Sequence, residues 1–175
     1  MFVGPPAGSF SGQTIGLIEA ITGMKAGEDY EAIKLAWGAA NQAFEDGKFD
    51  LFMRSGTVGS AAVDQFGSAK KFRMLSIPDS VLSTDAWAKY SSVPGRAADV
   101  VKAGTYSNQS NNNVDVLASA YVMFVGVHKD MSDDVAYQLT KAMFENLDDA
   151  HSVNSGLKPL TLDNAFVSLN AKLHP

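Results

Sequence analysis

The stretch that decides the fold is the first 24 residues, MFVGPPAGSFSGQTIGLIEAITGM. Phe2 and Val3 form a short apolar run, residues 4–12 are rich in Gly, Pro and Ser, and an apolar-periodic segment follows at 13–24. The period of three to four residues predicts an amphipathic helix, and the run before the loop predicts a strand. Strand, small-residue loop and helix in this order are typical of an α/β fold.

The same alternation continues beyond residue 24, with helical patterns between short apolar runs that predict strands buried on both faces. Helices are expected at 37–46, 58–66 and 83–90 and after Asp130 or Ser132, and strands at 49–53, at 72–77 and before 127. Trp37, Ala40 and Phe44 are expected to share one face of their helix, and the residues expected on the buried side of the later helix are Val135, Leu139, Ala142 and Met143. The sequence therefore predicts an α/β fold, with a mostly parallel sheet of about four or five strands flanked by helices.

A change of composition divides the chain. Residues 91–113 contain Pro94, two glycines and the polar tract 107–113, and we interpret this stretch as a connector. The predicted organisation is an α/β lobe at 1–112, followed at 113–175 by a crossover strand and C-terminal helices that are continuous with the same unit.

Composition excludes several functions. Of the 175 residues, 19 are acidic and 14 basic, and this balance argues against nucleic acid or an anionic membrane as partner. The chain has no cysteine, and its three histidines lie 23 residues apart, so neither spacing predicts a metal site or a catalytic triad. We expect no catalytic residue, no metal and no cofactor, no membrane span in the apolar stretch 114–127, and no signal peptide at the start.

The loop between the first strand and the first helix is the best candidate binding site. Free backbone N–H groups at a helix N-terminus, together with the helix dipole, favour a carboxylate or phosphate. The residues expected to contribute are Ser9, Ser11, Gly12 and Thr14. The alternative is ordinary helix capping with Ser11 as the N-cap residue. The spacing matches neither a Walker loop nor a nucleophile elbow.

Two further segments of the chain are candidate ligand-binding sites. Arg54, Gly56 and Thr57 follow the strand predicted at 49–53, and loops after the carboxyl ends of parallel strands bind ligands in open α/β sheets. Arg54 could pair with a carboxylate or could be a solvated arginine. Tyr106 could contact a ligand or could serve as half-buried packing.

In order along the chain, several segments resemble the TAXI class of TRAP-transporter solute receptors. They are Val3–Gly4 with the small-residue loop 8–14, Ala43–Asp50, Arg73–Ile77, Gly104–Tyr106, Asp134–Glu145 and Leu173–Pro175. The resemblance implies one lobe of a type II periplasmic-binding-protein fold. It also implies a periplasmic protein that captures a small organic anion, such as an amino acid or a dicarboxylate, between two lobes and delivers it to membrane subunits.

The resemblance covers only the later half to two thirds of such a receptor, so the chain is expected to be a fragment without the first lobe. Because both lobes contribute to binding, we expect weak binding or none by this stretch alone. Apolar surface left by the missing lobe favours self-association. A ligand-sensing regulatory module on the same lobe and a small α/β enzyme are the alternative functions.

Overall fold

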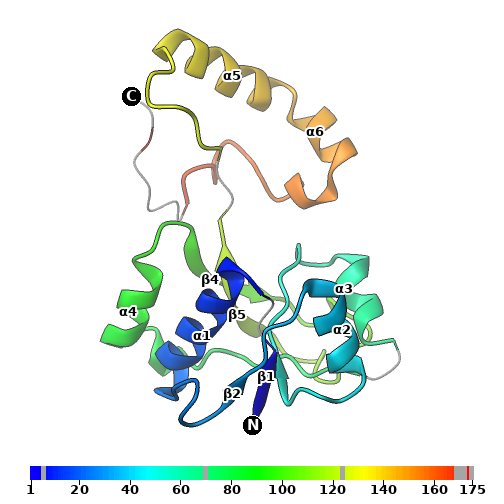
Figure 1. Cartoon of the computed structure of the whole chain (residues 1–175). Coiled ribbons are helices and arrows are strands. Elements are labelled where there is room, and N and C mark those ends of the chain that lie inside the picture. The colour runs from blue at the N-terminus through cyan, green and yellow to red at the C-terminus, as the bar shows by residue number, and fades with distance from the viewer. Residues whose placement is uncertain (5–6, 69–70, 123–124, 168–172, 174–175) are drawn as a thin grey trace.

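A parallel sheet of three short strands lies in the main body, with β1 (Phe2–Gly4) and β2 (Glu31–Ala32) at its N-terminal end (Figure 1). The computed structural model describes residues 1–4, 7–68, 71–122, 125–167 and 173. The third strand is β3 (Leu51–Phe52), and the strand order is β2-β1-β3. The central strand carries Val3, which is fully buried because neighbours cover it on both sides.

The helix predicted after the small-residue loop is α1, which runs from Ser9 to Thr22. It begins four residues before the periodic segment does, so most of the predicted loop 8–14 lies inside the helix. It ends at Gly23, whose left-handed backbone (φ 73°) is one that glycine adopts without steric cost. Ile18 on this helix packs with Val3 and Tyr30 in one of the buried clusters.

Shorter helices flank the sheet and the segments that follow it. They are α2 (Trp37–Glu45), α3 (Ala61–Phe66) and α4 (Asp85–Ser91), with a single 3-10 turn, η1 (Asp79–Val81), before α4. On α2 the buried residues are Ala40 and Ala43, whereas Trp37 is 40% exposed.

An antiparallel pair forms a second, separate sheet. β4 (Arg96–Val101) pairs with β5 (Val116–Tyr121), from Arg96 opposite Tyr121 to Val101 opposite Val116. The interpretation of 91–113 as a connector missed β4, and the parallel sheet has three strands where four or five were expected. The pair joins one segment from each side of residue 112.

The strand predicted at 72–77 is wrong, because only an isolated bridge from Phe72 to Gln109 is present there. Side chains take the place of a partner strand. The Asn111 amide accepts from Met74 N–H at 3.1 Å and donates to the Met74 carbonyl at 3.0 Å, and Ile77 N–H donates to the Leu117 carbonyl. The polar tract therefore satisfies backbone groups that a neighbouring strand would otherwise pair.

The C-terminal helices, α5 (Asp133–Glu145) and α6 (Leu147–Val153), extend away from the main body and are followed by the 3-10 turn η2 (Ser155–Leu157) (Figure 1). Ser132 is the N-cap of α5, as predicted, and its hydroxyl accepts from Val135 N–H. The predicted buried face is wrong, since no described residue of α5 is buried and Leu139 is 56% exposed. The reason is that α5 packs mainly against α6 rather than against the body.

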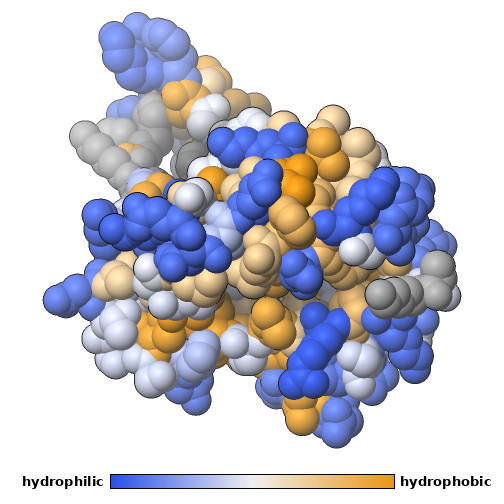
Figure 2. All heavy atoms as spheres, turned by 60° about the horizontal axis from the view of Figure 1, so that its bottom comes forward, coloured by the Kyte–Doolittle hydropathy of each residue, from blue (hydrophilic) through white to orange (hydrophobic). Residues whose placement is uncertain are grey.

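Hydrophobic and hydrophilic patches alternate on the face seen in Figure 2, which is the N-terminal side of the body. Phe2 and Met1 are about half exposed. Among the described residues, no helix is long and apolar enough to cross a membrane.

Candidate functional site

The carboxyl ends of β1 and β3 bring two predicted site segments to one edge of the sheet. The two strands are parallel, and Gly4 at the end of β1 pairs with Phe52 at the end of β3. The chain leaves β1 toward the start of α1 and leaves β3 toward Arg54. Ligands of open α/β sheets bind at this edge.

The start of α1 has no side-chain cap among the described residues. Its N-cap is Gly8, with a non-helical backbone (φ 90°, ψ −156°), so the alternative that Ser11 is the N-cap is wrong. Ser11 N–H donates to the Gly8 carbonyl at 3.1 Å. Ser9 and Phe10 lie in the first turn, where backbone N–H groups have no intrahelical acceptor. This end of the helix carries partial positive charge and open donors.

The hydroxyl groups of the predicted site residues differ in their hydrogen bonding. Thr14 is almost fully buried, and its hydroxyl donates to the Phe10 carbonyl at 3.1 Å, so it is engaged inside the helix. Ser11 is 4% exposed, and its hydroxyl has no hydrogen-bond partner among the described residues. A buried hydroxyl without a partner costs about 1–3 kcal/mol. Ser11 is therefore a predicted hydroxyl whose oxygen is enclosed and for which the described residues supply no partner. Gly12 offers space, because a Cβ there would meet nothing within 4 Å.

Arg54 is half-buried rather than solvated. Its Nη1 donates to Asn41 Oδ1 at 2.8 Å, and its guanidinium carbon lies 5.4 Å from the centre of the Phe66 ring. Its Nε–H is buried without an acceptor, and no described carboxylate forms an ion pair with it. Asn41 and Phe66 thus hold a positive charge that lacks a counterion, which is the arrangement that an anionic ligand would complete.

Gly56 and Thr57 lie in the exposed loop after Arg54. A Cβ on Gly56 would come within 2.8 Å of Val63, so the loop runs close against α3. The Thr57 hydroxyl faces the C-terminal segment, since a Cβ on Gly156 would lie 3.0 Å from it. Gly56 and Thr57 therefore lie where the body meets the turn η2.

Tyr106 is 3% exposed and packs in the cluster with Val101 and Val116. Its hydroxyl accepts from Gly59 N–H at 3.0 Å, and its ring meets that of Phe72 edge to face. In this conformation Tyr106 supports the loop that carries Arg54 from beneath and does not face a ligand. These contacts fit the alternative that Tyr106 is a packing residue better than the alternative that it contacts a ligand.

Sequence reasoning missed the residues that complete this edge. Asn41, which holds Arg54, lies one helical turn after Trp37 on the same face of α2. Trp37 contacts Phe10, and Phe10 also contacts Tyr121 at the end of β5. The spacing of Trp37 and Asn41 was visible in the sequence, but the pairing of Asn41 with Arg54 depends on tertiary structure.

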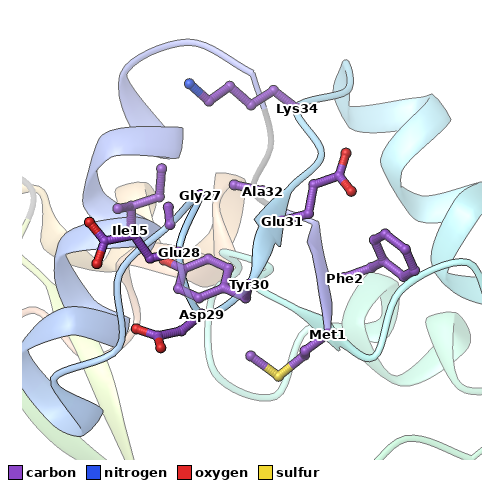
Figure 3. Close-up of a pocket in the computed structure, with 11 residues that line it drawn as sticks. Met1, Phe2, Ile15, Gly27, Glu28, Asp29, Tyr30, Glu31, Ala32 and Lys34 are labelled. Carbon is purple, nitrogen blue, oxygen red and sulfur yellow. The ribbon is translucent and has the colours of Figure 1, made fainter.

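A hollow with a volume of about 720 Å³ opens beside edge strand β2 (Figure 3). Its charged lining residues are Glu28, Asp29, Glu31 and Lys34. Tyr30 also lines it, and burial, with the nearby charge of Glu19, raises the pKa of its hydroxyl. Three carboxylates against one ammonium disfavour an anion here. The hollow is thus chemically unlike the edge that carries Arg54.

Among the described residues, no group of three or more His, Asp or Glu side chains could hold a metal ion.

No curated protein matches the chain. The family comparison gives a match over residues 1–175, the whole length of the sequence, to the NMT1-like family. The α/β architecture, with a parallel sheet flanked by helices and a small antiparallel pair, is consistent with one lobe of a periplasmic-binding-protein fold. The chain belongs to the NMT1-like family, an NMT1/TAXI-like family of solute-binding proteins.

Proposed function

We propose that this protein is an extracytoplasmic solute-binding subunit of a TAXI-type TRAP transporter. It captures a small organic anion, an amino acid or a dicarboxylate, and delivers it to the membrane subunits. One lobe is formed by this chain, and the solute binds between it and a second lobe.

The observation that carries the proposal is the Arg54 guanidinium, whose Nε–H has no acceptor among the described residues, at the same sheet edge as the uncapped start of α1. The first-turn amides and the Arg54 guanidinium are the donors that a carboxylate prefers. Ser11 adds a hydroxyl without a partner.

The test is an NMR titration of the ¹⁵N-labelled chain with succinate and glutamate, with glucose as the neutral control. Because one lobe supplies only part of the contacts, we expect dissociation constants on the order of 1 mM. The largest amide shifts should fall in residues 8–14 and 54–57. Equal shifts with glucose, or carboxylate shifts confined to residues outside 8–14 and 54–57, would contradict the proposal.

A matched pair of variants tests the role of the charge. Arg54→Gln removes the buried cation and should weaken carboxylate binding by roughly 10-fold or more, since hydrogen bonds to charged groups are worth about 1.5–3 kcal/mol. Arg73→Gln removes the same charge from an exposed side chain and should leave the affinity unchanged. Equal effects of the two substitutions would mean that only the net charge of the chain matters.

A further inference from the structure

Three aromatic side chains from different elements meet at the start of α1. Phe10, in the first turn of α1, lies 5.4 Å from Trp37 and 5.7 Å from Tyr121, measured between ring centres. Trp37 is the first residue of α2, and Tyr121 is the last of β5. We call these three residues the aromatic platform.

The platform is not part of the buried core. Phe10 and Tyr121 are partly exposed and Trp37 is 40% exposed. Within the described part of the chain, the indole N–H of Trp37 has no hydrogen-bond partner. A tryptophan with an exposed face and a free N–H is the kind of side chain that binding surfaces use, because it offers a large flat area at low entropic cost.

The platform adjoins the anion-binding groups. The chain before α1 is fixed to the chain before α2, since Ala7 N–H donates to the Leu35 carbonyl at 2.8 Å. Asn41, which holds Arg54, follows Trp37 by four residues, a rise of roughly 6 Å along α2.

The hydroxyl of Ser11 is an independent sign of a ligand at this place. It belongs to the residue after Phe10, is buried, and lacks a partner among the described residues. Buried polar atoms in folded proteins are nearly always satisfied, so an orphan hydroxyl next to the platform calls for an explanation. A carboxylate accepting from it would supply one.

We propose that the preferred solute is an aromatic carboxylate, whose ring stacks on Trp37 and Phe10 while its carboxylate meets the start of α1 and Arg54. This inference rests on the proposed function, and it narrows the solute class.

The experiment compares phenylacetate with cyclohexylacetate and succinate, each titrated into the ¹⁵N-labelled chain. The first two ligands have the same carboxylate and similar apolar bulk, but only one has a planar ring. The readouts are the Gly12 amide and the indole N–H signals of the two tryptophans. Trp87 is buried in the core, so its signal serves as an internal control.

Phenylacetate should bind roughly 3- to 10-fold more tightly than cyclohexylacetate, and it should shift the Trp37 indole signal but not that of Trp87. Trp37→Ala should remove the preference and leave succinate binding unchanged. Phe166→Ala, which deletes an exposed aromatic ring elsewhere, should preserve the preference. Should Trp37→Ala unfold the chain, Trp37→Leu keeps the apolar bulk and should equalise the two ligands.

Equal affinities for phenylacetate and cyclohexylacetate, with succinate still bound at residues 8–14 and 54–57, would overturn the aromatic preference and leave the proposed function standing. Shifts by all three carboxylates that are confined to residues 26–34 would overturn both.

Discussion

Single side chains at the sheet edge show where this protein carries unsatisfied polar groups. Within the described residues, Ser11 and Arg54 each keep a buried polar atom without a partner, as does the Tyr30 hydroxyl beside β2, while Thr14, one helical turn after Ser11 on α1, is satisfied inside the helix. Buried polar atoms without a partner are rare in folded proteins and call for an explanation. The contrast between Ser11 and Thr14 can be tested by substitution.

Ser11→Ala should raise the free energy of unfolding by roughly 1 kcal/mol, because it removes a buried hydroxyl that has no partner, and should weaken carboxylate binding. Thr14→Val is the matched control. It should lower the free energy of unfolding by roughly 1 kcal/mol through the lost bond to the Phe10 carbonyl, with binding unchanged. Urea unfolding and the NMR titration give the two quantities. Loss of stability in Ser11→Ala would show that its hydroxyl has a partner in the free protein.

Asp64 illustrates a residue whose charge stabilises the fold. Its carboxylate accepts from Asn108 N–H at 2.9 Å and from the Ser107 hydroxyl at 2.7 Å, which ties α3 to the polar tract. The Asn108 bond first, and then the Ser107 bond, lowers the pKa of this carboxyl. A carboxyl whose pKa is lower in the folded state stabilises above its unfolded pKa, and this stabilisation is lost as the pH falls through the folded pKa.

Asp64→Asn should therefore lower the urea midpoint at pH 7, and the difference from the unsubstituted chain should shrink as the pH falls below about 4. Urea unfolding at a series of pH values measures this. A difference that stays constant down to pH 2 would mean that the charge of Asp64 contributes nothing.

At the scale of elements, local sequence patterns predicted some helices and strands correctly and others wrongly. The strand, loop and helix at the start of the chain were predictable, because turn residues and apolar periodicity agree there. The segment 72–77 looks like a strand, but its backbone is bonded to the Asn111 side chain and to Leu117, which no local pattern reveals. Sequence periodicity cannot foresee a side chain that substitutes for a neighbouring strand.

Only part of the candidate site was predictable from the sequence. Ser11 and Arg54 could be nominated because they follow predicted strands. Asn41 and Trp37 could not, since their roles depend on how α2 packs beside both loops. Tyr106 was ambiguous in sequence, and its burial follows from the pairing of β4 with β5, which the sequence analysis missed.

The start of the sheet offers a test at the element scale. A Cβ on Gly4 would lie 2.3 Å from the Phe49 ring, so Gly4→Ala should push β1 away from the segment before β3. We expect a loss of roughly 1–3 kcal/mol in the free energy of unfolding. Gly38→Ala, in open space on α2, should instead raise this free energy by roughly 0.5–1 kcal/mol. Equal effects of the two substitutions on the free energy of unfolding would show that the Phe49 ring moves aside at little energetic cost.

At the scale of the whole molecule, α5 and α6 lie outside the main body and expose an apolar stripe. Val135, Leu139 and Met143 are on one face of α5 and are each at least 40% exposed. Exposed apolar patches of this kind mark interaction surfaces or association between copies. Self-association through this face remains a prediction.

Leu139→Glu should reduce the concentration-dependent increase in mass above 18.6 kDa that we expect from sedimentation velocity. Thr140→Glu introduces the same charge on a different face of α5 and should leave association unchanged. A chain that stays monomeric at high concentration without any substitution would contradict the prediction.

The central claim is that a carboxylate binds at the sheet edge, between the start of α1 and Arg54. The most direct measurement is the Nε–H signal of Arg54 in ¹⁵N NMR during a carboxylate titration, with Arg73 and Arg96 as references in the same spectra. The account predicts that the Arg54 signal shifts and becomes protected from solvent exchange, together with shifts of the first-turn amides of α1. An unchanged Arg54 signal, with shifts confined to residues 26–34 around the acidic hollow, would contradict it.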